Sequence, residues 1–252
     1  MISDTNKSSL DGRKMLILGG TGGIGLALAE AMSSLPVELH ILGRSQARLA
    51  AAARKIEAAG QPALPPVLYC TDLDDQAQLA RLLELVRTVD ILVISRGSFI
   101  EKSLRDTSAE EWSATTYSNL TLPGLLASAA ASAMAERGFG RILLFGGTRT
   151  ETIRGYRHNA AYAAAKTGLA VIVKSIAAEF SRQGVACTMI CPGFVDTEYL
   201  SEETRDRLRN LSARKRLMPS SSIAALCRFL LEGAIETVNG TIINADDGLY
   251  SL

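Results

Sequence analysis

The sequence lacks an excess of charge of either sign. Its 252 residues include 27 Lys and Arg against 26 Asp and Glu, which gives a net charge of +1. Proteins that follow nucleic-acid phosphates show a basic excess on one face, so we expect no nucleic-acid partner. Apolar runs long enough to span a bilayer are also missing, and residues 1–12 are polar where a secretory signal would be apolar. These absences predict a cytoplasmic protein with no membrane partner.

Cysteine and histidine are scarce as well. The four cysteines show no C-x-x-C spacing, and the histidines are only two, His40 and His158. Cys187 and Cys191 lie four residues apart in an expected strand, so both side chains point to the same face. A two-thiol metal pair is one interpretation, but buried free thiols are favoured because other metal ligands are so few. We expect no metal.

Short apolar runs bounded by turn residues alternate with longer helical patterns along the whole chain. This rhythm predicts an α/β fold of Rossmann type, a doubly wound parallel sheet with helices on both faces. No repeat or linker interrupts it, so residues 1–252 are expected to form a single domain. The expected strands are 14–18, 37–42, 67–70, 90–95, 141–145, 185–191 and 241–244. The expected helices are 24–35, 46–59, 75–87, 114–136, 159–182 and 222–231.

The first expected strand runs into a glycine-rich loop and then a helix. In one register Gly20, Gly22 and Gly25 match G-x-G-x-x-G, and in another Gly19, Gly23 and Gly25 match G-x-x-x-G-x-G. Such glycines let the backbone approach a pyrophosphate, and the helix N-terminus offers free N–H groups to the anion. A turn that only packs a helix closely on a sheet is the alternative, which the strand–loop–helix context disfavours. The residues expected to hold a dinucleotide here are Gly19, Thr21, Gly22, Gly23, Ile24 and Gly25.

The end of the second expected strand indicates which dinucleotide is bound. An NAD site places a carboxylate there to hold the ribose 2′-hydroxyl. This chain has Gly43 and Arg44 instead, with no acidic residue between Leu39 and Ile56. A guanidinium can pair with a 2′-phosphate, so the sequence favours NADP(H), with NAD(H) as the alternative.

Tyr162 and Lys166 lie near the start of the long helix that follows the fifth expected strand. Their spacing of four places the phenol and the ammonium on one helix face. A nearby cation stabilises phenolate, so we expect the pKa of Tyr162 to lie below the usual value of about 10. Tyr162 would then exchange a proton with a carbonyl or alcohol oxygen. The alternative for such a pair in isolation is a partly buried tyrosine beside a surface lysine.

Several motifs follow one another in a fixed order. They are Gly19-x-x-x-Gly23-x-Gly25, Asp72 after the third strand, Asn119 in the long helix, Tyr162-x-x-x-Lys166, Pro192-Gly193 with Thr197, and Asp246-Asp247-Gly248. With these motifs the chain resembles the short-chain dehydrogenase/reductase family over nearly its whole length. The resemblance implies a sheet of about seven strands and hydride transfer between a nicotinamide and a ketone or secondary alcohol. It also implies a homodimer or homotetramer that associates through helices 114–136 and 159–182.

The resemblance further assigns roles to single residues. Tyr162 would be the general acid, while Lys166 would hold the nicotinamide ribose and lower the tyrosine pKa. Asn119 would position a water for proton relay. Asp72 and Leu73 would border the adenine. The other residues implied at the cofactor are Gly97, Pro192, Gly193, Val195 and Thr197, the last beside the nicotinamide amide.

The chain departs from the family after the fourth strand, where Asn-Asn-Ala-Gly is usual. Here the residues are Ile94, Ser95, Arg96 and Gly97. Gly97 keeps the close backbone approach, whereas Arg96 is a large cation that points either to solvent or to a cofactor phosphate.

A second departure concerns the family's serine after the fifth strand, whose hydroxyl bonds the substrate oxygen. Counting forward from the strand gives Gly147, and counting back from Tyr162 gives Arg149. Thr148 is the only hydroxyl between the two, and we take it as the substitute in the catalytic set. A missing donor would cost about 10²–10³ in rate, which leaves a cofactor-binding sensor with little turnover as the alternative function.

Residues 198–218 lie where the family carries its variable substrate lid, and they are rich in charge. One interpretation is a basic rim for an anionic acyl carrier or coenzyme A, which would suit a 3-oxoacyl thioester. A solvated helix of mixed charge is favoured. Arg154, Tyr156, Arg157 and His158 are placed to line a pocket. The expected substrate is a small carbonyl compound, with a sugar, pteridine or steroid as alternatives to the thioester.

Overall fold

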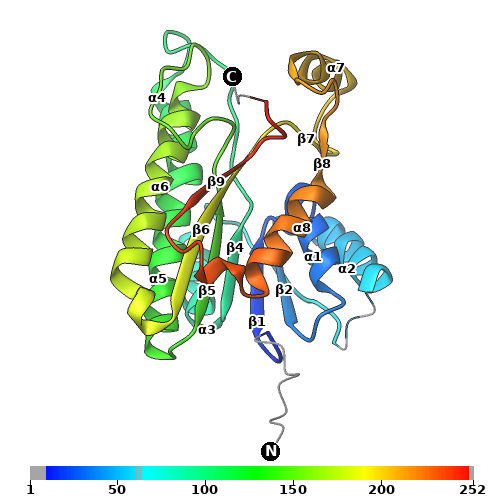
Figure 1. Ribbon diagram of the computed structural model, residues 1–252, viewed down its shortest axis with the longest axis vertical. Helices are drawn as coiled ribbons and strands as arrows, with labels where there is room; N and C mark the ends of the chain where they lie inside the picture. The colour runs from blue at the N-terminus through cyan, green and yellow to red at the C-terminus, as the bar shows by residue number, and fades with distance from the viewer. Residues whose placement is uncertain (1–9, 61, 63, 250–252) are drawn as a thin grey trace, which may run out of the picture.

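The structure is a computed structural model that describes residues 10–60, 62 and 64–249 (Figure 1). Its centre is a seven-stranded sheet in the order β3-β2-β1-β4-β5-β6-β9, in which all neighbouring strands run parallel. The strands are β1 (Lys14–Leu18), β2 (Glu38–Gly43), β3 (Val67–Cys70), β4 (Ile91–Ile94), β5 (Gly140–Phe145), β6 (Val185–Pro192) and β9 (Ile242–Ala245). The predicted Rossmann-type fold is confirmed, and no expected strand boundary is off by more than one residue.

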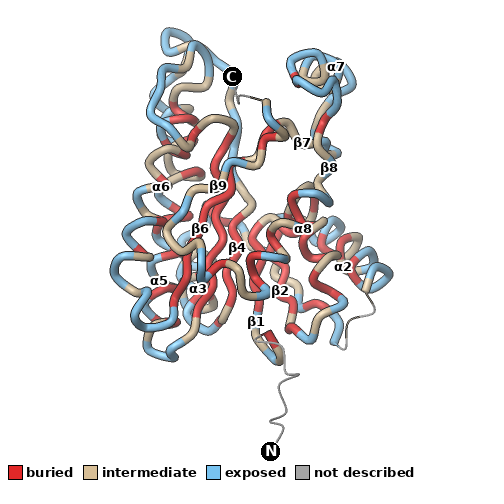
Figure 2. Tube along the Cα trace, in the orientation of Figure 1, coloured by how far each residue is buried: buried red, intermediate tan, exposed pale blue. Residues whose placement is uncertain are grey.

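Helices cover both faces of this sheet. The α-helices of the described residues are α1 (Gly23–Met32), α2 (Gln46–Gly60), α3 (Gln76–Thr88), α4 (Ala109–Thr116), α5 (Leu122–Glu136), α6 (Ala160–Phe180), α7 (Glu202–Leu211) and α8 (Ser220–Leu231), and all but α4 and α7 pack on the sheet through its apolar clusters. One apolar cluster joins the sheet to α1, α2 and α8, and a second joins it to α3, α5 and α6. Figures 1 and 2 show these groups on opposite sides of a buried sheet. Side chains alternate between the faces, so Met15 and Ile17 enter the first cluster, and Leu16 and Leu18 the second.

The strand order reverses between β1 and β4. From β1 the chain moves outward to β2 and β3, then crosses back so that β4 pairs with β1 on its other side. The connections after β1 and β4 therefore leave in opposite directions and open a crevice at the carboxyl ends of these strands. Ligands of open α/β sheets bind in such a crevice.

The long helix expected at 114–136 is a composite. It begins earlier, at α4, where Ser108 and Glu111 form a reciprocal capping box. A π-helical turn, Tyr117–Thr121, then interrupts the regular hydrogen-bond pattern before α5 continues. This turn contains Asn119, and π-turns of this kind occur frequently at functional sites.

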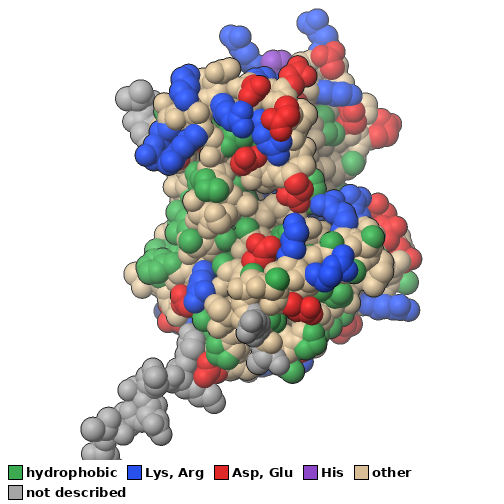
Figure 3. Space-filling view, turned by 90° about the vertical axis from the view of Figure 1, so that its right-hand side faces the viewer, with side chains coloured by type: hydrophobic (Ala, Val, Ile, Leu, Met, Phe, Trp, Pro, Cys, Tyr) green, Lys and Arg blue, Asp and Glu red, His purple; other side chains and the backbone are tan. Residues whose placement is uncertain are grey.

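The lid predicted at 198–218 forms helix α7, framed by the two-residue parallel strands β7 (Val195–Asp196) and β8 (Met218–Pro219). Helix α7 has no buried residue and stands beyond the carboxyl ends of the main strands (Figure 1). Side chains of both signs gather there (Figure 3). The ion pairs of the lid arginines are Arg205 with Asp196 and Glu202, Arg207 with Glu101, Arg209 with Asp206, and Arg214 and Arg216 with Asp247. This pairing supports the mixed-charge interpretation over the basic rim.

Helix α6 is, among the described residues, the one helix long and apolar enough to cross a bilayer. Leu169, Val173 and Ile176 on this helix are buried in the second cluster. A core helix of this kind passes the same test, so its composition is weak evidence for a membrane span. Cys187 and Cys191 are buried free thiols in that cluster, as expected.

The close contact of α1 with the glycine loop leads to a stability prediction. A Cβ at Gly25 would lie 2.4 Å from the carbonyl oxygen of Gly19 and 2.5 Å from Ser95 Oγ. Because the nearer atom belongs to the backbone, we expect Gly25→Ala to lower the unfolding free energy by about 1–3 kcal/mol, measured by urea denaturation. Gly155→Ala is the control, since no described atom lies within 4 Å of its added Cβ; it should change stability by less than about 0.5 kcal/mol. Equal midpoints for both variants would show that the loop tolerates a side chain.

Candidate functional site

A cavity of about 680 Å³ opens at the crevice between the ends of β1, β2 and β4. Its walls are the glycine loop, the end of β2, the segment after β4, and the start of the lid. The predicted cofactor residues that line it are Gly19, Thr21, Gly22, Gly23, Ile24, Arg44, Leu73, Gly97 and Thr197. The structure therefore brings together residues from five separate segments of the sequence.

The other predicted cofactor residues do not line this cavity; they are Gly25, Asp72, Tyr162, Lys166, Pro192, Gly193 and Val195. Gly25 packs on the carbonyl of Gly19, as described above. Asp72 accepts the N–H of Asp74 at 3.1 Å and shapes the turn before α3. Gly193 fits against Asp246, whose Cα would lie 2.8 Å from an added Cβ. Pro192 ends β6 and Val195 forms β7.

Several residues of the cavity wall were missed by sequence reasoning, among them Ser95, Arg48 and Tyr199. Ser95 donates its hydroxyl to the carbonyl of Leu18 at 3.0 Å and so ties the end of β4 to the end of β1. Arg48 donates to the Tyr199 hydroxyl, with its guanidinium 5.0 Å from the tyrosine ring centroid. The spacing of four between Arg44 and Arg48 was the available signal.

Arg96 lies in the cavity wall and is half-buried. Burial lowers its pKa, and the charge of Arg44 lowers it further, while Asp74 and Asp72 act in the opposite direction. Of the two orientations expected for Arg96, the structure supports the one toward the cofactor cavity.

Lys166 is buried, and its Nζ donates to the carbonyl oxygen of Phe145 at 2.7 Å. Burial lowers the pKa of Lys166 to about 8. Nζ lies 5.9 Å from the ring centroid of Tyr162, on the predicted common face of α6. The edge of Phe99 packs on the tyrosine ring, with 5.1 Å between centroids.

The pKa expected for Tyr162 is wrong in direction. Burial raises it above its usual value, and the neighbouring Cys191 thiol and Tyr156 add to the rise. The physical reason is the loss of water around the phenol, which disfavours the charged phenolate; burial penalises the charge of Lys166 as well. Tyr162 therefore holds its proton at neutral pH in the protein without cofactor.

Asn119 is fully buried beside these two residues. Its Nδ2 donates to the carbonyls of Ser98 at 2.8 Å and Thr115 at 3.0 Å. Its Oδ1 has no hydrogen-bond partner among the described residues. A Cβ on Gly97 would lie 2.2 Å from that Oδ1 and 3.4 Å from Lys166 Nζ. The glycine thus lets the amide and the ammonium converge, and Oδ1 is an acceptor for a water or ligand hydrogen.

Gly147 lies against the hydroxyl end of Tyr162. A Cβ there would be 2.7 Å from Tyr162 Oη, so the forward count from β5 identifies the residue in the family's serine position. Thr148, our expected substitute, donates its hydroxyl to the carbonyl of Pro192 at 3.1 Å. In this arrangement the single hydroxyl hydrogen of Thr148 is used within the protein, and the side chain anchors the loop to β6. The catalytic role of Thr148 stays a prediction.

Residues 154–158, which were expected to line a pocket, lie in a loop whose side chains contact other residues of the same loop. Tyr156 donates its hydroxyl to the carbonyl of Arg149 at 2.5 Å, and the Arg154 guanidinium lies 5.6 Å from the Tyr156 ring centroid. His158 forms an antiparallel bridge with Ser103 after β4. This bridge joins the loop before Tyr162 to the segment that carries Phe99.

The residues present fit a nicotinamide dinucleotide. Gly22 and Gly23 offer a backbone surface without side chains at the N-terminus of α1, which suits a pyrophosphate. Lys166 and the unpartnered Oδ1 of Asn119 lie where a ribose and an ordered water would complete their hydrogen bonds. When bound, the nicotinamide supplies or accepts the hydride, and the protein supplies binding, orientation and the proton.

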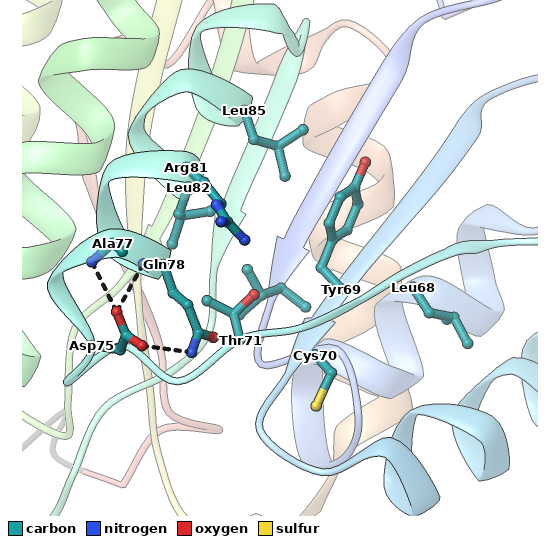
Figure 4. A pocket seen from close by; sticks show the side chains of 11 residues that line it. Leu68, Tyr69, Cys70, Thr71, Asp75, Ala77, Gln78, Arg81, Leu82 and Leu85 are labelled. Atoms are coloured by element: carbon teal, nitrogen blue, oxygen red, sulfur yellow. Dashed lines mark hydrogen bonds between the residues drawn. The ribbon is translucent and has the colours of Figure 1, made fainter.

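A second cavity, of about 500 Å³, lies between α3 and the edge strand β3 (Figure 4). Tyr69, Cys70 and Arg81 contribute to its wall. Asp75 caps α3 at one end of it by accepting the N–H groups of Ala77 and Gln78. We place the candidate active site at the larger cavity, because the glycine loop, Gly97 and the lid meet there.

Comparisons with known proteins agree with this geometry. The family model described as short chain dehydrogenase matches residues 13–208. The 3-oxoacyl-[acyl-carrier-protein] reductase of Haemophilus influenzae is 30% identical, over 96% of this chain and 99% of its own length. A tropinone reductase homolog of Arabidopsis thaliana is 26% identical over 98% of this chain and 93% of its own. A solved short chain dehydrogenase/reductase family protein superimposes with a TM-score of 0.83 at 28% identity, covering 96% of this chain and 99% of that one.

The buried Lys166 gives a pH dependence of stability. Its pKa is about 8 in the folded protein against 10.5 ordinarily, so between these values the unfolded chain binds a proton that the folded chain does not. The unfolding free energy of the wild type, relative to Lys166→Met, should therefore rise with pH across this window, by up to about 1.4 kcal/mol per pH unit. Urea denaturation of both proteins between pH 7 and 10 measures this difference. The titrations of Cys187 and Cys227 cancel, because both proteins contain these thiols and their pKa values do not depend on Lys166. A difference that stays constant over this range would contradict the lowered pKa.

Proposed function

Because the chain belongs to the short-chain dehydrogenase family, and so is an oxidoreductase acting on C=O or CH–OH groups, we propose that it is an NADPH-dependent ketone reductase. The nicotinamide supplies the hydride when bound, and Tyr162 donates its phenolic proton to the carbonyl oxygen. The observation that carries the proposal is the meeting of Tyr162, Lys166 and Asn119 beside a cavity closed by a glycine loop.

The protonation states suit reduction. Burial keeps the Tyr162 proton in place, as a general acid requires. Lys166, with a pKa of about 8, is mostly protonated at neutral pH. It therefore attracts the phenolate that forms when Tyr162 donates. Because its pKa is close to neutral pH, Lys166 can also release and take up a proton there. A water on Asn119 Oδ1 would return the proton from solvent to Tyr162 by way of Lys166.

The preference for NADP(H) is supported by two arginines. Arg44 is exposed at the end of β2 and Arg96 is half-buried after β4, and both line the cavity. Neither forms a hydrogen bond or ion pair within the described part of the chain, and their like charges repel. Two unpaired guanidiniums facing one cavity favour a ligand with an extra phosphate, which a 2′-phosphate provides.

The substrate class is a ketone or the matching secondary alcohol. One relative is named a 3-oxoacyl-[acyl-carrier-protein] reductase, which favours an acyl thioester as the substrate. Another is named a tropinone reductase homolog, which favours a different kind of ketone. Arginines of the lid are paired with carboxylates, so the lid offers little unpaired positive charge for an anionic carrier.

We also propose a homodimer or homotetramer that associates through α5 and α6, because Leu125 on α5 and Val171 on α6 are exposed apolar side chains. The cytoplasmic location stays a proposal that rests on the sequence.

A second candidate function is a cofactor-binding protein with little turnover. It is favoured by Gly147, which supplies no hydroxyl beside Tyr162, and by Thr148, whose hydrogen is used elsewhere. This candidate shares the cofactor site and differs only in the rate of the chemical step.

Tyr162→Phe separates binding from chemistry. The variant should bind NADPH with an unchanged Kd and lose at least about 100-fold in kcat, because the proton donor is gone while the ring remains. Fluorescence titration measures binding, and NADPH oxidation against a panel of ketones and acetoacetyl thioesters measures turnover. Tyr69→Phe, on β3, is the control. Turnover that survives in Tyr162→Phe would remove this tyrosine from the mechanism, and wild type that binds NADPH tightly without turnover would favour the second candidate.

Arg44→Ala and Arg96→Ala test the cofactor preference. Each should weaken NADPH binding by about 10- to 100-fold, because a charge-assisted bond to the 2′-phosphate is lost. NADH, which lacks that phosphate, should bind both variants as it binds the wild type and serves as the internal control. Equal losses for both cofactors would mean that the arginines hold another part of the dinucleotide.

A further inference from the structure

The glycine loop already holds an anion that belongs to the chain itself. The backbone N–H of Gly23, at the N-terminus of α1, donates to both carboxylate oxygens of Glu198, each at 3.1 Å. Glu198 comes 175 residues later in the sequence, at the start of the lid. A carboxylate at this position satisfies an otherwise unpaired N–H group and lies at the positive end of the helix dipole.

The neighbours of Glu198 hold it on the loop. A Cβ on Gly22 would lie 2.0 Å from Glu198 Oε1 and 2.1 Å from the Tyr199 hydroxyl oxygen, so both side chains rest directly on that glycine. Arg48 lies 3.6 Å from the Glu198 carboxylate and also donates to the Tyr199 hydroxyl. We call residues 197–199 the strap.

The strap is connected to the rest of the lid. Arg205 on α7 donates to the Asp196 carboxylate at 2.8 Å and to the carbonyl of Thr197 at 2.9 Å. Two residues further along α7, Arg207 forms a bidentate ion pair with Glu101, in the segment that follows β4. Movement of the strap therefore pulls on α7.

A cofactor pyrophosphate and the Glu198 carboxylate cannot share this place. The pyrophosphate requires the same N–H groups of the loop, and there is not even space for a methyl group between Gly22 and the strap. Two anions at one helix N-terminus would also repel each other. The Glu198 side chain is 53% exposed, so it can move into solvent without a large loss of packing.

We infer that Glu198 is a built-in competitor for the pyrophosphate position, and that it sets the affinity of the protein for its dinucleotide. This inference rests on the proposed function, since it concerns how the same cofactor site is filled. The cofactor binds only to molecules whose strap has left the loop, so its apparent Kd exceeds the intrinsic Kd by the inverse of that fraction. Displacement of the strap also releases Arg48, which lines the cavity with Arg44, from its contacts with Glu198 and Tyr199.

Glu198→Ala, in the full chain, tests the inference by binding alone. We expect the Kd for NADPH to fall by about fivefold to tenfold, with an intermediate fall for Glu198→Gln, which keeps an acceptor but loses the charge. Inorganic pyrophosphate, titrated by calorimetry, should gain a similar factor in Glu198→Ala because it competes for the same N–H groups. Glu203→Gln is the matched control, because it removes the same charge from the lid. The Glu203 side chain forms no hydrogen bond or ion pair among the described residues, and it acts on Arg207 only through its charge.

Stopped-flow mixing measures the rate at which NADPH associates with each protein. The wild-type rate of NADPH association should level off at high NADPH concentration, where opening of the strap limits it, and should stay linear in Glu198→Ala.

The outcomes separate the inference from the proposed function. Equal or weaker NADPH and pyrophosphate binding in Glu198→Ala, with normal binding by the wild type, overturns the competitor role and leaves the reductase proposal intact. If neither protein binds NADPH or NADH while pyrophosphate binds Glu198→Ala more tightly, the competitor role stands and the reductase proposal fails. A gain in Glu203→Gln as large as in Glu198→Ala reduces the effect to net charge and overturns the inference.

Discussion

The contact between Gly25 and the end of β1 is the constraint on which the site depends. Helix α1 approaches the carbonyl of Gly19 closely because Gly25 has no side chain to intervene. That approach directs the first N–H groups of α1 into the crevice between β1 and β4, where the strand order reverses. Ser95 reinforces it from the other strand by bonding the carbonyl of Leu18. The pyrophosphate position, and with it the contact to Glu198, follows from this packing of helix on sheet.

Burial determines the protonation states of Tyr162 and Lys166. Tyr162 and Lys166 are both removed from water, and burial opposes the charged form of each. The ammonium keeps a partner in the carbonyl of Phe145, and Asn119 faces it across Gly97 with a free acceptor. At neutral pH Tyr162 is neutral, whereas Lys166, with a pKa of about 8, is mostly charged. A ligand that brings polar groups to this site would therefore offset the cost of burying the ammonium.

Much of this arrangement is visible in the sequence. The central strands are continuous apolar runs buried on both faces, and such runs locate a parallel sheet reliably. The glycine loop, Arg44 and the Tyr162–Lys166 spacing are local patterns, and their roles in binding and catalysis stay predictions; in the structure the loop and Arg44 line one cavity, and Tyr162 and Lys166 share a face of α6. The π-turn around Asn119 was not predictable, because residues 117–121 suit an ordinary helix and the turn depends on tertiary packing. The contact of Glu198 with Gly23 spans 175 residues, and no local pattern encodes it. The pKa of Tyr162 was misjudged because spacing gives proximity to a cation but not the depth of burial.

Gly147 has a consequence for any attempt to add a hydroxyl beside Tyr162. The hydroxyl end of Tyr162 lies 2.7 Å from the position that a Cβ on residue 147 would take. A serine at this position therefore meets the tyrosine ring, and the ring has to shift before the new hydroxyl fits. Gly147→Ser is thus a change of packing at the phenol as well as a change of hydrogen-bonding groups.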